Sequence, residues 1–233
     1  SYGLGGGEIL DCNWLQIYEN VMDPFHVAVL HSVFSGGQFS DALNLRPTVS
    51  WEDADAAVRS TQDRALPDGR LFRRVTEILL PNIRIVPSVA AGEPGEGFEP
   101  ARHIGWILPI DDTHTRMYSL LRVPLRDGEP VMPPRARHGG KLWAEPSDEE
   151  HHRMPGDEEA IVSQRPIAIH ADEHLASSDR GVILTRKMVA RGIAAVREGL
   201  DPPGVLRDPS ARVVTTHAGN AVLPARPHAV THP

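Results

Sequence analysis

The stretch from His103 to Pro124, HIGWILPIDDTHTRMYSLLRVP, predicts two β-strands that fold back on each other. Apolar side chains occupy the even positions from Ile104 to Ile110, and they dominate the odd positions from Met117 to Val123. Alternation of this kind is typical of strands with one buried face. The polar triplet 111–113 between the two arms is typical of a turn. We therefore expect an antiparallel hairpin of residues 103–110 with residues 115–124.

Four further runs upstream of this hairpin are short, rich in β-branched or aromatic residues and bounded by turn residues. They are Val49–Glu52, Ala57–Gln62, Leu71–Leu80 and Ile83–Val89. Between the second and third runs lies Pro67-Asp68-Gly69, a strong turn sequence. Successive hairpins of this kind predict a mainly antiparallel sheet.

Helical patterns precede and follow the predicted strands in the sequence. Asp23 can cap a helix from about Pro24 to Val33, which the glycine pair 36–37 would end. Apolar residues at a spacing of three and four predict a longer helix over 179–200, with Asp179 as its cap. The order helix, strands, loop, helix indicates an α+β fold with helices on one face of an antiparallel sheet.

The length of 233 residues suits one domain with flanking segments. Residues 1–12 contain a run of glycines and are expected to be a linker, residues 13–204 would form the domain, and residues 205–233 would form a tail. Residues 126–156 show no periodicity and hold several prolines. A loop of this length is either a functional lid or a surface excursion.

Composition excludes several classes of protein. The net charge of −7 and the pI of about 5.9 argue against a broad nucleic-acid surface. No apolar run reaches the ~20 residues of a membrane span, and no signal peptide is visible. Cys12 is the only cysteine, which excludes an internal disulfide and every metal site built on cysteine alone. A chain of this kind is most simply cytoplasmic.

The segment Asn20-x-x-Asp23-Pro-x-His26-x4-His31 is one of two that could carry chemistry. Two histidines five residues apart point roughly 140° from each other on an ideal α-helix. They can share one metal ion only if the helix is locally widened or the side chains reach around it, and such irregularities are frequent at functional sites. Two imidazoles with one carboxylate are typical of non-haem iron(II). The alternative is a buried helix with two incidental histidines.

The second segment contains His170-x-x-Glu173-His174. Taken alone, it matches the inverted zincin motif, in which two histidines four apart on a helix bind zinc and a glutamate acts as general base. A zinc hydrolase is therefore one alternative function.

Both segments together resemble the catalytic domain of the Rieske non-haem iron aromatic-ring oxygenases, in the branch of phthalate dioxygenase and dehydrodivanillate O-demethylase. The resemblance covers about 13–204. In the first segment it is carried by Glu19-Asn-x-x-Asp-Pro-x-His-x4-His31. In the second it is carried by Asp157, by the run Ser163-Gln-x-Pro-Ile167, and by Glu173-His-Leu-x-x-Ser-Asp179 before a helix containing Arg186. Arg165 departs from the pattern, because relatives usually have glycine there, and so does the run 168–170.

The resemblance implies a role for five residues. His26, His31 and Asp157 would bind the mononuclear iron, although the neighbouring acids at 158 and 159 leave the register of the carboxylate open. Asp23 would be the acid that links the iron to an electron donor, and Asn20 would lie close to the metal. The implied fold is helix-grip, an antiparallel sheet curled around a long C-terminal helix.

The resemblance also implies an oxygenase that uses Fe(II) and O2 to hydroxylate or O-demethylate an aromatic compound. Electrons would come from NADH through a reductase or ferredoxin-type donor and a Rieske [2Fe–2S] cluster, within a homotrimer. A Rieske cluster needs two cysteines and two histidines, so this chain would rely on a separate or missing domain for it. Arginines on strands, such as Arg84, Arg116 or Arg122, could hold a substrate carboxylate or simply face solvent. A third alternative is a metal-free helix-grip domain that binds an apolar ligand.

Overall fold

The structure, a computed structural model, describes residues 2–34, 38–89, 97–123, 125–131, 143–208, 210 and 214–225. Its main strands are β1 (Tyr2–Leu10), β2 (Thr48–Asp53), β3 (Ala57–Ala65), β4 (Leu71–Leu79), β5 (Ile83–Ile85), β6 (Gly97–Pro100), β7 (His103–Pro109), β8 (Thr115–Arg122) and β11 (Gly219–Leu223). Its helices are α1 (Trp14–Asn20), α2 (His26–Val29), α3 (Asp41–Asn44), α4 (Asp148–Arg153), α5 (Asp157–Val162) and α6 (Arg180–Arg197).

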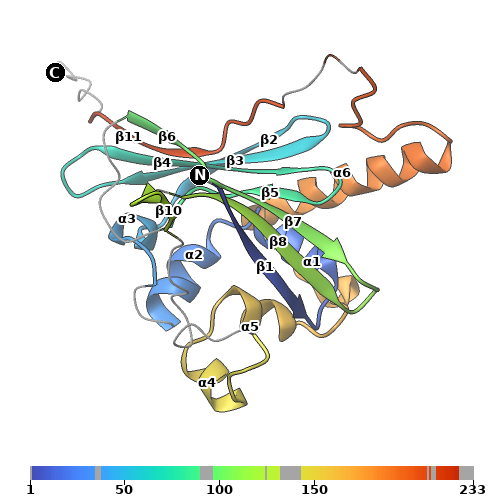
Figure 1. Cartoon of the computed structure of the whole chain (residues 1–233), viewed down its shortest axis with the longest axis horizontal. Helices are drawn as coiled ribbons and strands as arrows, with labels where there is room; N and C mark the ends of the chain where they lie inside the picture. The colour runs from blue at the N-terminus through green and yellow to red at the C-terminus, as the bar shows by residue number, and fades with distance from the viewer. Residues whose placement is uncertain are drawn as a thin grey trace.

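All nine main strands form one antiparallel sheet (Figure 1). Its order is β1-β8-β7-β5-β4-β11-β6, and β3 pairs with the other edge of β4 and carries β2. The predicted strands and both predicted turns are confirmed within a few residues of their expected ends. The predicted sheet with helices and a long C-terminal helix is therefore confirmed at the level of fold class.

Two segments that were expected to lie outside the domain belong to this sheet. Residues 2–10, expected to be a linker, form β1 and pair with β8, and residues 219–223 of the expected tail form β11 between β4 and β6. The expected boundaries at 13 and 204 are therefore too narrow. The glycines of β1 serve close packing: Gly6 has a φ of +88°, and a side chain there would collide with the backbone of Met117.

The helix expected from Pro24 begins instead at His26, because Asp23 does not cap it. The Asp23 carboxylate accepts a hydrogen bond from Phe25 N, two residues on, and Phe25 is the residue that precedes the helix. After Val29 the helix continues as a π-helix over Leu30–Phe34. The glycine pair expected to end it lies outside the described residues.

The long helix α6 begins after Asp179, as predicted, and Gly199 follows its end with a φ of +74°. The Asp179 carboxylate, however, turns back to accept a hydrogen bond from Ala176 N. In the region 126–156, where no structure was expected, α4 begins with a capping box of Ser147 and Glu150. A short hairpin of β9 (Leu125–Arg126) and β10 (Glu129–Pro130) precedes it, and residues 132–142 lie outside the described residues.

The helices pack on one face of the sheet, which we call the inner face and define by Val58, Ile78 and Ile107. These three side chains are fully buried in one cluster with residues of α1 and with Met188 of α6. At Gly181 a side chain would collide with the Met22 carbonyl and with Trp51. The absence of a side chain there lets the start of α6 meet the segment that leads to α2.

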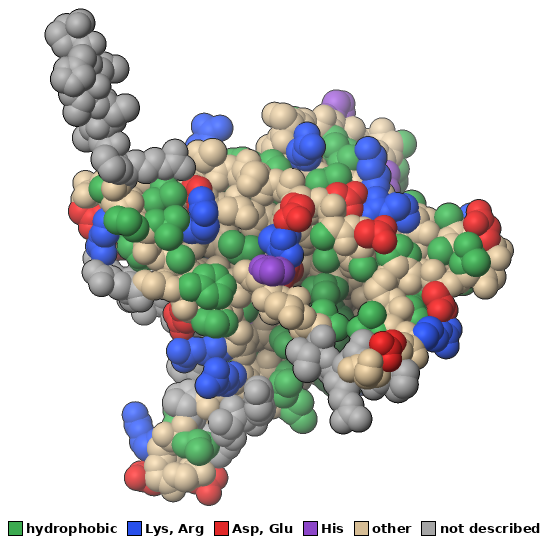
Figure 2. All heavy atoms as spheres, turned by 90° about the horizontal axis from the view of Figure 1, so that it is seen from above, with side chains coloured by type: hydrophobic (Ala, Val, Ile, Leu, Met, Phe, Trp, Pro, Cys, Tyr) green, Lys and Arg blue, Asp and Glu red, His purple; other side chains and the backbone are tan. Residues whose placement is uncertain are grey.

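Charged side chains of both signs are interspersed on the face drawn in Figure 2, with no single basic patch on that face. Of the helices that the structure describes, none combines the length and apolar composition needed to span a bilayer.

Candidate metal centre

The π-helix brings the two predicted histidines together. Each turn of a π-helix contains about one more residue than an α-helical turn, so residues five apart lie on the same side. The ring centres of His26 and His31 are 5.5 Å apart, with the planes at 65°. The local widening that the spacing required is therefore present in the structure.

Asp157 completes a group of three ligand atoms, although it lies more than a hundred residues away in the sequence. Its Oδ1 is 3.2 Å from His26 Nε2 and 3.1 Å from His31 Nε2. The potential ligand atoms of the three residues all lie within 4.8 Å of one another. Two imidazole nitrogens and one carboxylate oxygen suit iron(II), and they leave other coordination positions open. The residues present therefore fit such an ion.

The outer nitrogen of each ring faces a polar side chain, which leaves both Nε2 atoms directed at the centre. His31 Nδ1 lies 2.7 Å from Gln38 Oε1, so the amide oxygen accepts the Nδ1 proton, and in the neutral ring it is Nε2 that carries the lone pair a metal needs. His26 Nδ1 is buried and lies 3.5 Å from Asp23 Oδ2, too poorly aligned for a good hydrogen bond. Sequence reasoning missed Gln38, because nothing in its spacing distinguishes it from a surface glutamine.

Asp157 is the first residue of α5, where the N-terminus of a helix favours a carboxylate. The side chain of Glu159 accepts a hydrogen bond from Gly156 N and also contacts His151 Nδ1, so it holds the start of this helix in place. Of the three consecutive acids, Asp157 alone is grouped with the two histidines among the described residues. Its side chain is 38% exposed, whereas that of His31 is 3% exposed.

The electrostatics of the group favour an ionised acid. Burial raises the pKa of Asp157, but hydrogen bonds from His26 and His31, together with their charges, hold that pKa well below its usual range. Burial lowers the pKa of His26, but the hydrogen bond to Asp157 and the charges of Asp157 and Asp23 raise it to about 10. A cation is thus favoured at this position.

The two other predicted residues lie beside this group. Asn20 Nδ2 donates a hydrogen bond of 3.4 Å to Asp157 Oδ1, and Asn20 ends α1. Asp23 lies one turn before His26, and its side chain is 31% exposed. All five predicted site residues therefore lie within one connected cluster.

The zinc-hydrolase motif is not supported by the backbone. His170 lies in a 3-10 turn, Glu173 is extended, and His174 follows outside any helix, so the two histidines do not share a helix face. His170 and Glu173 do group with Glu19 as potential ligands. Both of those acids, however, already bind the guanidinium of Arg186, which supplies the positive charge. The alternative based on this motif is therefore wrong.

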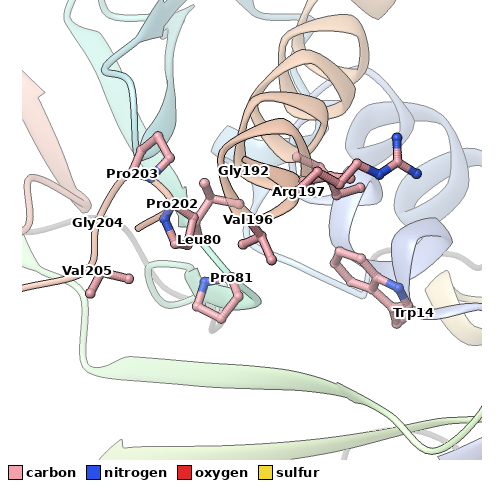
Figure 3. A pocket seen from close by; sticks show the side chains of 12 residues that line it. Trp14, Leu80, Pro81, Gly192, Val196, Arg197, Pro202, Pro203, Gly204 and Val205 are labelled. Atoms are coloured by element: carbon pink, nitrogen blue, oxygen red, sulfur yellow. The ribbon is translucent and has the colours of Figure 1, made fainter. Parts of the chain in front are cut away.

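A cavity of about 420 Å³ lies elsewhere, between α6 and the turn after β4. Trp14 lies at one end and Val205 at the other, with Leu80, Pro81 and Val196 between them (Figure 3). The walls are almost entirely apolar. None of the three grouped residues of the metal centre lines this cavity, so the cavity lies apart from that centre.

Comparisons with known proteins identify relatives over most of the chain, although no family model matches. The chain is 39% identical over 208 residues to the phenoxybenzoate dioxygenase subunit alpha of Ectopseudomonas oleovorans, covering 89% of this chain and 49% of that protein. It is 30% identical over 222 residues to the tert-butanol monooxygenase / tert-amyl alcohol desaturase oxygenase subunit of Aquincola tertiaricarbonis, covering 85% and 45%. The chain thus spans about half the length of the curated relatives it matches.

Among solved structures, the NdmA QL mutant of Pseudomonas putida CBB5 with caffeine aligns with a TM-score of 0.51 at 18% identity. The alignment covers 90% of this chain and 57% of that one. This likeness concerns the fold: a large antiparallel sheet with a C-terminal helix.

Proposed function

This chain is homologous to the oxygenase subunits of Rieske-type non-haem iron oxygenases, and from this we propose that it forms the iron-binding catalytic part of such an enzyme. The enzyme would use Fe(II) and O2 to hydroxylate or O-demethylate an aromatic compound. In hydroxylation, NADH gives two electrons, one oxygen atom enters the C–H bond, and the other leaves as water with two protons. Because the chain spans about half of its relatives, the activity of the whole enzyme is part of the proposal.

The observation that carries the proposal is the convergence of His26 Nε2 and His31 Nε2 on Asp157 Oδ1, at 3.2 and 3.1 Å. Three ligands on one side of an ion leave room for O2 and substrate on the other. Bound iron would supply the activation of O2, which does not react directly with an aromatic ring at a useful rate. This chemistry explains why a widened helix would bring two histidines together beside an acid of α5.

Each protein group around the centre has a separate task in this proposal. Gln38 holds the ring of His31 in the tautomer that presents Nε2. Asn20 donates to Asp157 Oδ1 and restrains its carboxylate. Asp23 lies beside His26 at the partly exposed edge of the cluster, a suitable position for an acid that connects the centre with an electron donor.

The proposed electron donors lie outside this chain. A Rieske [2Fe–2S] cluster would pass electrons from an NADH-dependent reductase or ferredoxin-type protein, and a homotrimer would bring the cluster of one subunit to the iron of the next. A helix-grip arrangement, with the sheet curled around α6, is the finer description of fold that we propose. It would give the aromatic substrate an enclosed site.

Anomalous scattering tests the proposal most directly. Crystals of the purified protein, grown after anaerobic loading with Fe(II), should give a peak at the iron absorption edge among His26, His31 and Asp157. The peak should weaken on the low-energy side of that edge. Zinc bound elsewhere, or tight binding of an aromatic ligand to a metal-free protein, would contradict the proposal.

Replacing Asp23 with asparagine is expected to lower turnover about 10- to 100-fold while iron stays bound. Asparagine keeps an oxygen that can accept the Phe25 N–H bond but removes the negative charge beside His26. The measurement is NADH-dependent O2 consumption by the full-length enzyme with its reductase, using phenoxybenzoate as the probe, alongside iron analysis. Asp111→Asn is the matched control, because Asp111 pairs with His114 at the same spacing on the surface. Unchanged turnover in Asp23→Asn would contradict the proposed role.

A further inference from the structure

The register of the sheet separates the three strand arginines that the sequence could not distinguish. Arg84 pairs with Ile78 on one side and with Gly105 on the other, so its side chain lies on the inner face. In β8 it is Met117 that pairs with Ile107 of the inner face. Side chains alternate along a strand, so Arg116 and Arg122 project from the opposite face. Arg84 alone of the three faces the helices that carry the metal centre.

The side chain of Arg84 runs across Gly105. A Cβ atom at Gly105 would lie 2.8 Å from Arg84 Nε and 3.0 Å from its Cγ, so a larger residue would displace the arginine. Arg84 is partly buried, yet it makes no hydrogen bond or ion pair within the part of the chain that the structure describes. A guanidinium with five donors is thus held in place without an acceptor.

Acids at the start of α5, Asp157 among them, act electrostatically on Arg84. Burial lowers the pKa of Arg84, and the negative charges of Asp157 and Glu158 oppose this. His103 lies on the same face, two residues from Gly105, and burial and the charge of Arg84 lower the pKa of His103 to about 4. The imidazole of His103 is therefore neutral at pH 7. It offers no second positive charge to an anion that binds beside Arg84.

Two other arginines of the inner face hold the fold together by donating hydrogen bonds to backbone carbonyls. Arg64 donates to Leu45 O, and Arg74 donates to Pro87 O and Ser88 O. Both are almost completely buried. Arg84 differs from them because, among the described residues, no backbone carbonyl accepts a hydrogen bond from it.

We propose that Arg84 is a specificity residue that binds a carboxylate of the substrate beside the metal centre, so that the substrates of this protein are aromatic acids. The inference rests on the proposed function and deepens it. A partly desolvated cation without a partner is costly, and a carboxylate can accept two parallel hydrogen bonds from a guanidinium. Such a contact would hold the aromatic ring at a fixed distance from the iron ligands.

The test compares an acid with its uncharged isostere. Phenoxybenzoate and phenoxybenzamide are titrated anaerobically into the iron-loaded protein, with binding followed by calorimetry. Arg84→Gln is expected to weaken binding of the acid by about 10- to 100-fold, since a hydrogen bond to a charged group is of that order. The affinity for the amide should change less than about threefold. Arg84→Lys keeps the positive charge but lacks the two parallel donors of a guanidinium. It should recover part of the lost affinity for the acid.

Arg122→Gln is the matched control, because Arg122 is an exposed arginine of the same sheet on the opposite face. It should bind both probes as the wild type does. Equal weakening of acid and amide by Arg84→Gln, or loss of iron from that variant, would show a structural role and overturn the inference. Failure of the wild type to bind the acid would overturn it as well.

Iron analysis of the same samples separates this inference from the proposed function. Binding of the acid that depends on Arg84 in a protein that takes up no iron would refute the oxygenase but support the carboxylate site. Iron at the centre with affinity for the acid unchanged in Arg84→Gln would refute the carboxylate site alone.

Discussion

His31→Ala is expected to reduce bound iron from about one per chain to below about 0.1 after removal of excess metal, because a site of three ligands loses one of them. His31 is the most buried of the three, at 3% side-chain exposure, so water can replace its nitrogen only poorly. Its ring is held by Gln38 on one side and packs on Phe39, with ring centres 4.2 Å apart. Metal analysis by mass spectrometry measures the loss.

The control for this prediction is His114→Ala, since His114 also contacts an acid but lies on the surface. That variant should keep its iron. Circular dichroism should show that His31→Ala remains folded, so that lost metal is not confused with lost structure. A full equivalent of iron in His31→Ala would contradict the proposed centre, and so would stoichiometric zinc that only His170→Ala removes.

Arg186→Ala is expected to lower the free energy of unfolding by about 2–3 kcal/mol, less than the cost of removing one partner from a fully buried ion pair, because this one is only partly buried. Arg186 binds two carboxylates at once. Its Nε and Nη2 donate to Glu19 at 2.8 Å each, and its Nη1 and Nη2 donate to Glu173 at 2.5 and 2.9 Å. The Arg186 side chain is 19% exposed, so solvent cannot fully replace these bonds. Urea unfolding followed by circular dichroism measures the change.

The reason for so large an effect is that the variant leaves two acids facing each other without a cation. The hydrogen bonds with Glu19 and Glu173 raise the pKa of Arg186, which agrees with a firmly held charge. Glu19 precedes Asn20 in α1, so the same bonds connect α6 with the segment that leads to the metal centre.

Two further variants identify the cause. Arg207→Ala breaks an ion pair with Asp201 of similar two-bond geometry on the surface, and it should leave stability unchanged. Arg186→Ala combined with Glu19→Gln should recover part of the loss, because it removes one of the unpaired charges. A change of less than about 1 kcal/mol in Arg186→Ala would show that this contact adds little to stability.

The strands of the sheet could be predicted where alternation and turn chemistry agree, as in the hairpin of β7 and β8. β1 could not, because Gly5, Gly6 and Gly7 have no side chains from which to read a buried face, and their role depends on contact with β8. β11 is short and sits between two partners, so all but the last of its residues are buried and no alternation appears. Both strands form by pairing with strands that are distant in the sequence. A local sequence pattern does not show such pairing.

The residues of the candidate site also divide into those that the sequence could predict and those that it could not. The spacing of His26 and His31 required a widened helix, and the π-helix confirms that requirement. The assignment of Asp157 rested on the resemblance, since three adjacent acids are equivalent by composition alone. Gln38 and Arg84 could not have been selected, because each depends on which way a side chain faces once the chain has folded.

The position of β11 has a consequence for how the chain reaches its folded state. β11 joins β4 to β6, yet most of the chain is synthesised between β4 and β11. Until residue 223 has left the ribosome, β4 and β6 each present an open edge to other nascent chains. Long-range pairing of this kind gives a high contact order and slow folding. The pairing of β11 therefore comes after that of β4 with β3 and β5, and the chain is vulnerable to aggregation until β11 has paired.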